Sequence, residues 1–360
     1  MSGFYPLKVS AIVRETPDCL AIRFNVPHGV EDKFKFIQGQ YLTLKFDIGG
    51  EEIRRSYSIC SSPLEKELWV AVKLIPGGKM SSHIHANLKL GDTVQSMSPN
   101  GKFYTSLNPY NKNHYHLFAV GSGITPILSH LKTILETESQ AQVLLYYGNR
   151  NEESIIFKST LESLQRKHGE RLQVHYIFSQ PLGNYAADLT GRIDGEKVGA
   201  ILENKVDKSH NNLFFICGPG DMMVAVQASL LNHAIDPSKI NLEFFQAPVS
   251  NSPIEAEKIN TAGSSHGGAK VTYINDGETY VVELKPEQSL LDAALEANID
   301  AAFACKGGSC CTCRAKIIEG EVKMKVNYAL SASEVEQGYV LTCQSHPITQ
   351  TVTVDYDKGK

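Results

Sequence analysis

Four cysteines in the C-terminal third of the chain restrict its possible folds more than any other feature. Cys305, Cys310 and Cys313 follow the spacing C-x4-C-x2-C, and Cys343 lies further along the chain. This is the plant-type spacing for a 2Fe-2S cluster. Two glycines in the short loop let its backbone curl around inorganic sulfide without a side-chain clash. The spacing therefore predicts a ferredoxin-like site with these four cysteines as its ligands.

A structural zinc site is the alternative for the same cysteines. Such a site usually pairs two C-x2-C halves or includes histidine ligands. Here there is a single C-x2-C, and no histidine lies between Cys305 and Cys343. Cys311 lies inside the loop but off the spacing, so we predict that it is not a ligand.

Length and composition indicate a multidomain protein with an acidic C-terminal part. A chain of 360 residues is long for one hydrophobic core and predicts two or three domains. The net charge of −4 argues against nucleic-acid binding. Residues 270–360 hold 9 lysines and arginines against 13 aspartates and glutamates, a balance that suits docking to a basic partner face.

The chain also lacks the patterns of targeting and membrane segments. The N-terminus has no signal-peptide pattern, and no apolar run approaches the roughly 18 residues of a membrane-spanning helix. Cys19, Cys60 and Cys217 are scattered and fit reduced thiols. We therefore predict a cytoplasmic location without membrane insertion.

The pattern along the chain predicts three domains of different fold class. Residues 1–110 contain short, closely spaced β segments, typical of a small antiparallel β-barrel. Residues 111–247 alternate apolar strands with helical stretches, which favours an α/β doubly wound parallel sheet. Residues 248–268 are rich in Pro, Ser, Asn and Gly and predict a flexible linker. Residues 269–360 begin with a strand–Asn-Asp-Gly–strand hairpin and carry the cysteine loop, which predicts an α+β (β-grasp) ferredoxin domain.

Two motifs in the first domain favour a bound flavin. The segment Arg55-Ser56-Tyr57-Ser58 supplies an arginine for a pyrophosphate, a tyrosine to lie against a flat ring and a hydroxyl to reach its edge. Downstream, a glycine pair precedes an expected helix whose first N–H groups can bind a pyrophosphate. The alternative for these glycines is an ordinary hairpin loop. The candidate flavin-binding residues are Arg55, Tyr57, Ser58, Lys73, Gly78, Lys79, Met80 and Ser81.

Motifs in the second domain favour a nicotinamide dinucleotide. A G-x-G-x-x-P segment at 121–126 follows an apolar strand and opens a helix, so its backbone can approach a pyrophosphate closely. As a bare motif it is weaker than the G-x-G-x-x-G fingerprint. Arg150 follows the next strand, where an acidic residue favours NADH and an arginine favours the 2′-phosphate of NADPH. We predict NADPH rather than NADH, with Ser179 and Arg192 as helpers; the alternative for Arg150 is a solvated surface side chain.

In this order the motifs resemble those of the ferredoxin–NADP reductase superfamily. That superfamily carries R-x-Y-S on a barrel strand, the proline form of the glycine turn and a C-G-P-x-x-M segment, here at 217–222. The resemblance implies that Ser58, Thr125 and Glu243 line the hydride-transfer site without acting as acid–base catalysts, and that Phe245 lies beside the flavin. Ordinary packing of a terminal strand is the alternative for Glu243 and Phe245. The implied nicotinamide residues are Gly121, Gly123, Thr125, Arg150, Ser179, Arg192, Cys217 and Gly218.

The whole domain order resembles the reductase components of multicomponent oxygenases, in particular the phenylacetyl-CoA epoxidase type, whose ferredoxin is C-terminal. The G-Y-V-L-T-C-Q-S segment at 338–345 also fits that group. The resemblance implies electron transfer from NADPH through FAD and the cluster to an oxygenase partner. FMN remains an alternative to FAD, because phthalate dioxygenase reductase, which has the same domain order, resembles an FMN-binding form of this fold. The alternatives are a reductase of another di-iron or Rieske oxygenase, an enzyme that reduces a small molecule, and a non-redox zinc-binding module.

Overall fold

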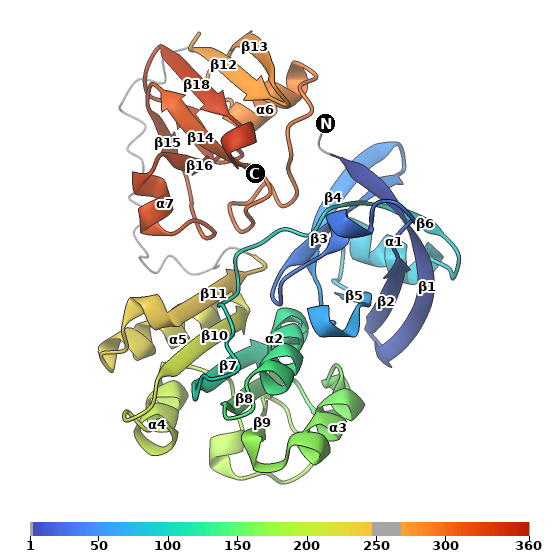
Figure 1. Ribbon diagram of the computed structural model, residues 1–360, viewed down its shortest axis with the longest axis vertical. Helices are drawn as coiled ribbons and strands as arrows, with labels where there is room; N and C mark the ends of the chain where they lie inside the picture. The colour runs from blue at the N-terminus through green and yellow to red at the C-terminus, as the bar shows by residue number, and fades with distance from the viewer. Residues whose placement is uncertain (1–2, 247–267, 360) are drawn as a thin grey trace. The chain divides into compact units, whose positions relative to one another are not determined.

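The computed structural model describes residues 3–246 and 268–359 (Figure 1). These residues form two compact units, one with nearly all of residues 5–246 and the other with residues 268–359. The predicted linker, 248–268, lies outside the described residues apart from Gly268. Within the described ranges, no helix is long and apolar enough to cross a membrane.

The N-terminal sheet has six antiparallel strands in the order β4-β3-β6-β1-β2-β5. Ile59 directly follows β4 and forms an isolated β-bridge with Val70 on β5. The two outer strands of the sheet therefore meet, as in a barrel. Alternating side chains such as Ile22 and Leu42 fill the interior of the barrel, and the helix α1 packs against this core. The elements are β1 (Phe4–Thr16), β2 (Cys19–Asn25), β3 (Tyr41–Ile48), β4 (Glu51–Ser58), β5 (Leu68–Lys73), α1 (Lys79–Asn87) and β6 (Thr93–Met97).

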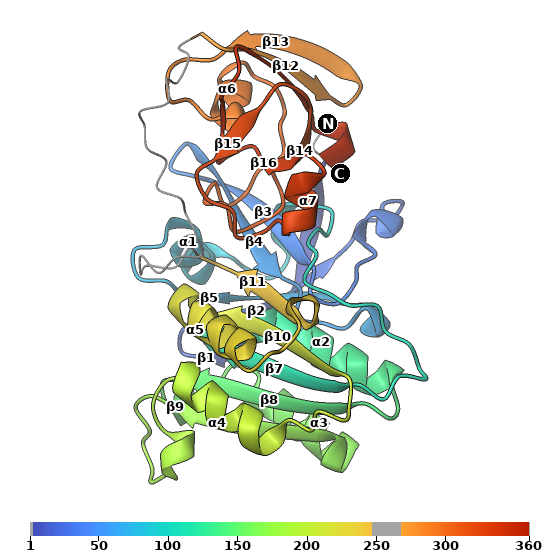
Figure 2. The same ribbon diagram turned by 90° about the vertical axis from the view of Figure 1, so that its left-hand side faces the viewer.

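The second sheet of this unit is parallel, with the order β11-β10-β7-β8-β9. Its strands are nearly continuous apolar runs because helices cover both faces. Figure 2 shows α4 and α5 over one face and α2 and α3 over the other. The strands are β7 (His114–Val120), β8 (Gln142–Asn149), β9 (Leu172–Phe178), β10 (Asn212–Gly218) and β11 (Ile240–Phe244). The helices are α2 (Ile124–Thr137), α3 (Lys158–His168), α4 (Gly195–Lys205) and α5 (Gly220–Asn232).

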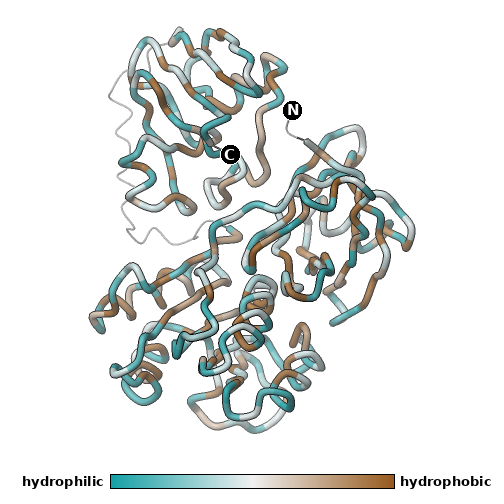
Figure 3. Tube along the Cα trace, in the orientation of Figure 1, coloured by the Kyte–Doolittle hydropathy of each residue, from teal (hydrophilic) through white to brown (hydrophobic). Residues whose placement is uncertain are grey.

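The connection order of this sheet fixes where a ligand can bind. From β7 the chain proceeds outward to β8 and β9, and then returns to the other side of β7 for β10 and β11. Ligands of doubly wound sheets bind at such a switch point, beyond the carboxyl ends of the two central strands. Figure 3 shows the hydrophobic residues along these strands and the hydrophilic ones in the outer turns. The glycine turn after β7 and the Cys-Gly pair at the end of β10 therefore share one edge.

The C-terminal unit is a mixed sheet of the order β13-β12-β18-β14-β16, in which β12 and β18 are parallel. This is the β-grasp arrangement expected for a ferredoxin domain. Asp276 and Gly277 both have positive φ, 53° and 77°, so the first hairpin closes with the two-residue turn that the sequence predicted. The elements are β12 (Lys270–Asn275), β13 (Glu278–Glu283), α6 (Leu290–Glu296), β14 (Arg314–Glu319), β15 (Val322–Met324), α7 (Ala332–Glu336), β16 (Tyr339–Leu341), β17 (Ser345–Pro347) and β18 (Thr351–Asp355).

Candidate functional site

The four predicted cysteine ligands lie together as two pairs. The Cys310 thiol donates to Cys305 Sγ at 3.2 Å, and the Cys313 thiol donates to the sulfur of Cys343. Among residues 3–246 and 268–359, no three histidine, cysteine, aspartate or glutamate side chains converge on a point that could hold one metal ion. Two pairs of thiols provide two ligands for each of two iron atoms, so the donor set fits a 2Fe-2S cluster.

Several N–H groups point at these sulfurs. The Gly307 amide donates to Cys305 Sγ at 3.3 Å, and the Gln344 side-chain amide donates to Cys343 Sγ at 3.6 Å. The hydrogen bond from Cys310, helped by the Gly307 amide, lowers the pKa of Cys305, and the same hydrogen bond raises the pKa of Cys310. Thiolate is the form that binds iron, so the donating thiol of each pair must still lose its proton when iron binds.

Cys311 has different surroundings. Its thiol donates to the carbonyl oxygen of Ala329 at 3.3 Å, and its side chain is buried in the core of the C-terminal unit. That Cys311 is not a ligand stays a prediction, because the predicted ligand Cys313 is buried in the same core.

The glycine turn after β7 packs directly against the end of β10. A Cβ atom on Gly123 would lie 2.1 Å from the Cys217 carbonyl oxygen, and one on Gly218 would lie 2.5 Å from Cε of Met222. Gly121 has a φ of +55°, and its carbonyl oxygen accepts a hydrogen bond from the Tyr147 hydroxyl at 3.1 Å. Sequence reasoning missed Tyr147, because nothing near it in the chain indicates that β8 supports the turn. The turn and the end of β10 therefore pack backbone against backbone, a close approach that glycine allows because it has no side chain.

Ser58 and Glu243 meet although the two are 185 residues apart in the sequence. Ser58 Oγ donates to Glu243 Oε2 at 3.1 Å. Glu243 on β11 lies beside Cys217 in the parallel register, so the barrel and the second sheet face each other at this carboxyl group. Burial raises the pKa of Glu243 from 4.5 to about 8, and the hydrogen bond from Ser58 opposes part of that rise. The structure thus brings two of the three predicted hydride-site residues into contact.

Thr125 and Phe245 complete the predicted lining. Thr125 is buried at the start of α2, and its hydroxyl donates to the Ser122 carbonyl oxygen at 3.0 Å. Phe245 follows β11 and is 38% exposed. An exposed aromatic ring at the edge of a sheet is available to stack against a flat ligand.

The start of α1 presents its backbone rather than its side chains. Gly78 is the N-cap residue, and no side chain caps the helix. Ser81 Oγ accepts from the Ile75 N–H at 3.1 Å and donates to the Gly78 carbonyl oxygen, so it holds the turn. Lys79 forms an ion pair with Glu51, and the Met80 side chain is buried in the barrel core. These contacts leave the N-terminal N–H groups as the means of binding a pyrophosphate.

The remaining flavin candidates lie on two strands of the barrel. Tyr57 and Arg55 are on β4, and Arg55 is exposed with one guanidinium N–H donating to the carbonyl oxygen of Arg54. Lys73 ends β5, 3.5 Å from a carboxylate oxygen of Asp18. A Cβ atom on Gly121 would lie 3.8 Å from Lys73 Nζ, so this lysine borders the glycine turn.

The predicted 2′-phosphate residues lie at the ends of β8 and β9. Arg150 Nε donates to Gln180 Oε1 at 2.8 Å, and the Ser179 N–H donates to the Asn149 carbonyl oxygen. Arg192 lies on a wall of a cavity of about 540 Å³ between β9 and α4. Sequence reasoning missed Gln180, which orients the arginine.

Comparison with known families agrees with this arrangement. Residues 6–104 match the family model described as "Oxidoreductase FAD-binding domain", and residues 117–228 match "Oxidoreductase NAD-binding domain". Residues 274–347 match "2Fe-2S iron-sulfur cluster binding domain". The predictions of an oxidoreductase with FAD, a 2Fe-2S cluster and a nicotinamide donor are confirmed.

Similar proteins extend this agreement to the full length. The chain is 39% identical over 359 residues to one subunit of the 1,2-phenylacetyl-CoA epoxidase of Escherichia coli, covering 99% of both chains. It is 32% identical to the ferredoxin reductase component of 3-ketosteroid-9-alpha-monooxygenase of Mycobacterium tuberculosis, over 98% of this chain and 96% of the other. The fold matches that of phthalate dioxygenase reductase with a TM-score of 0.60 and 22% identity, covering 98% of each chain. The predicted three-part architecture is confirmed.

Proposed function

Because this chain belongs to the family of oxygenase reductase components that join FAD-binding, NAD-binding and 2Fe-2S domains, we propose that it carries electrons from NADPH to an oxygenase of the phenylacetyl-CoA epoxidase type. The observation that carries the proposal is the 39% identity to the epoxidase subunit over 99% of both chains. The paired cysteines and the Ser58–Glu243 contact support it independently.

Each predicted cofactor has a set of residues that would hold it. A flavin accepts the two electrons of a hydride together and releases them singly, as a one-electron cluster requires. Tyr57 and the N–H groups at the start of α1 would hold the flavin, with Arg55 and Lys73 neutralising its phosphates. The turn at 121–123 and the Cys217–Gly218 end of β10 would hold the nicotinamide end of the donor. Cys305, Cys310, Cys313 and Cys343 would hold the cluster.

Glu243 would affect hydride transfer through the protonation state of its carboxyl group, and it would not act as an acid or base. With a pKa of about 8, its carboxyl group is mostly protonated at pH 7. A neutral carboxyl adds no negative charge to the place where a hydride arrives, and its proton stays on Glu243 beside Ser58. Thr125 lies buried in the same region and restricts where a nicotinamide ring can lie.

The choice of NADPH rests on Arg150. Its guanidinium group would face the adenosine ribose of a dinucleotide bound at this edge of the sheet, and its Nε donates to Gln180 Oε1. An arginine in that place favours a 2′-phosphate. We also infer a cytoplasmic location, because none of the eight cysteines, all of them among the described residues, is in a disulfide bond, a state that a reducing compartment maintains.

Reconstitution with an oxygenase tests the proposal. The E. coli phenylacetyl-CoA epoxidase, purified without the subunit that this chain resembles, should consume phenylacetyl-CoA only when this protein and NADPH are added. Bound flavin and cluster should give the purified protein a brown colour. Rapid NADPH oxidation with a quinone and none with the epoxidase would favour a small-molecule reductase. Activity with a ketosteroid or Rieske oxygenase alone would favour another member of the family.

A further inference from the structure

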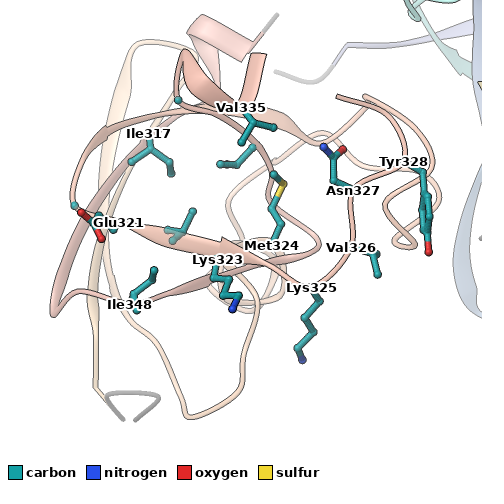
Figure 4. A pocket seen from close by; sticks show the side chains of 14 residues that line it. Ile317, Glu321, Lys323, Met324, Lys325, Val326, Asn327, Tyr328, Val335 and Ile348 are labelled. Carbon is teal, nitrogen blue, oxygen red and sulfur yellow. The ribbon is translucent and has the colours of Figure 1, made fainter. Parts of the chain in front are cut away.

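A groove in the C-terminal unit lies beside the cysteine site. It has a volume of about 740 Å³ and is formed by the segment 320–328, β14 and α7 (Figure 4). Its walls are mostly apolar, including Ile317, Met324 and Val340. Val335 and Ile348 are 39% and 48% exposed, which is high for such side chains in a folded domain. The groove therefore leaves apolar surface open to solvent.

Backbone hydrogen bonds join one wall of the groove to both halves of the cysteine site. The Tyr328 N–H donates to the carbonyl oxygen of Gly308, which lies in the cysteine loop, at 3.0 Å. The Lys325 N–H donates at 2.9 Å to the carbonyl oxygen of Gln344, the residue after Cys343. A Cβ atom on Gly308 would lie 2.9 Å from the Val326 side chain. The backbone path from the groove to the ligand Cys343 thus runs through one hydrogen bond and one residue, Gln344.

One border of the groove is basic. Figure 4 shows the side chains of Lys323 and Lys325 extending from one border of the apolar wall. Both are exposed, and neither forms an ion pair with a residue in the described part of the chain. Glu321 lies at the opposite end of the groove, as Figure 4 shows. Charges further than about 8 Å apart are screened at physiological ionic strength, so the local lysines outweigh the acidic total of this domain.

We propose that this groove is the surface on which the oxygenase docks, and that the oxygenase fills it with an apolar side chain flanked by carboxylates that face Lys323 and Lys325. An apolar anchor in a pocket with charges at its rim is the usual composition of an interface centre. This inference rests on the proposed function, and it reverses the basic partner face that the charge of the whole domain suggested.

Charge reversal tests the proposal by binding. The dissociation constant of the E. coli phenylacetyl-CoA epoxidase, again without the subunit that this chain resembles, is measured by calorimetry for wild type, Lys325→Glu, Lys323→Glu/Lys325→Glu and Ile348→Ser. We expect each single change to weaken binding about tenfold at low salt, and roughly 0.5 M salt to reduce the effect of the lysine changes but not of Ile348→Ser. Lys270→Glu on β12, with the same charge change outside the groove, should bind like wild type.

Cytochrome c serves as a second acceptor because its surface is rich in lysine. The Lys323→Glu/Lys325→Glu protein should reduce cytochrome c faster than wild type at low salt, the opposite sign to the oxygenase. The visible absorbance of each variant checks its cluster content.

Three outcomes overturn the docking surface. Equal affinity of wild type and the double variant removes the groove from the interface. Equal slowing with both acceptors would mean that the groove serves transfer within this chain. Self-association of wild type that the variants abolish would assign the groove to a second copy. If wild type itself neither binds nor reduces the epoxidase, the proposed function fails first.

Discussion

Among single residues, Glu243 is the one whose charge should affect hydride transfer most directly. Its folded pKa of about 8 lies above the ordinary 4.5, so it loses its proton as the pH rises through 8. We expect NADPH–ferricyanide turnover to fall above pH 8, because a carboxylate then faces the place where negative charge arrives. The Glu243→Gln protein keeps the hydrogen-bonding shape without the charge. For this variant, the rate at which NADPH reduces the protein, followed by stopped flow, should stay level up to about pH 9.

Ser58→Ala supplies the control for that assignment. The hydrogen bond from Ser58 lowers the pKa of Glu243, so its loss should move the alkaline limb of the pH profile to higher pH. An alkaline limb that Glu243→Gln leaves in place would assign it to another group.

The preference for NADPH depends on Arg150. Replacing it with alanine should raise KM for NADPH about tenfold and leave KM for NADH unchanged, because an exposed charge-assisted contact contributes roughly 1.4 kcal/mol. Gln180→Ala should raise KM for NADPH by a smaller factor, since it loosens Arg150 without removing its charge. Steady-state kinetics with both nucleotides measure this. A parallel rise of both KM values would place Arg150 outside the 2′-phosphate site.

Individual residues differed in how far sequence could place them. Three of the four cysteines were predictable because one short loop sets their spacing, and Cys343 followed because the plant-type pattern ends with one distant cysteine. The Ser58–Glu243 contact could be expected only from a family resemblance, since no local rule joins residues 185 positions apart. Tyr147 and Gln180 escaped prediction because their partners come from neighbouring strands whose register the sequence does not state. The Met80 side chain lies in the barrel core, which a motif match does not distinguish from a binding role.

At the scale of elements, the close approach of the β7–α2 turn to β10 forms the nucleotide edge. A Cβ atom on Gly123 would lie 2.1 Å from the Cys217 carbonyl oxygen, so Gly123→Ala must push the turn and β10 apart. We expect a loss of about 1–3 kcal/mol in the unfolding free energy of this unit and a higher KM for both nucleotides. Gly195→Ala in α4 is the matched control, because its Cβ atom would make only ordinary contacts, the nearest at 3.6 Å. Equal thermal midpoints for the two variants would contradict the steric argument.

The larger elements followed from sequence, and the short ones did not. The parallel strands and α2 were predictable because they are long apolar runs joined by glycine turns. The β12–β13 hairpin followed from Asp276-Gly277, whose positive φ values few other pairs adopt. The three-residue strands β15 and β17 carry too few residues to show a period, and they form only because each pairs with the other. The groove beside the cysteines depends on that pairing, so the amino-acid pattern does not indicate it.

At the scale of the whole molecule, we propose that electrons pass through the cluster when the acceptor is a protein, but not when it is a small molecule. On this route ferricyanide, a small anion, takes electrons at the flavin, whereas cytochrome c receives them from the cluster. Cys310→Ser removes one ligand of the Cys305–Cys310 pair. We therefore expect this variant to keep NADPH–ferricyanide activity and to lose roughly nine-tenths or more of cytochrome c reduction, because even an outer contact of a metal site is worth about tenfold and a direct ligand contributes more.

Cys311→Ser separates loss of the cluster from damage to the fold. Its thiol lies in the core of the same unit, one residue from Cys310, and donates to the Ala329 carbonyl oxygen. A serine hydroxyl can make the same hydrogen bond, so this variant should retain iron, acid-labile sulfide and cytochrome c reduction. If Cys310→Ser and Cys311→Ser lost cytochrome c reduction equally, the loss would reflect folding of the loop. If Cys310→Ser also lost ferricyanide activity, electrons would not leave the flavin independently of the cluster, and the proposed order of the two centres would be wrong.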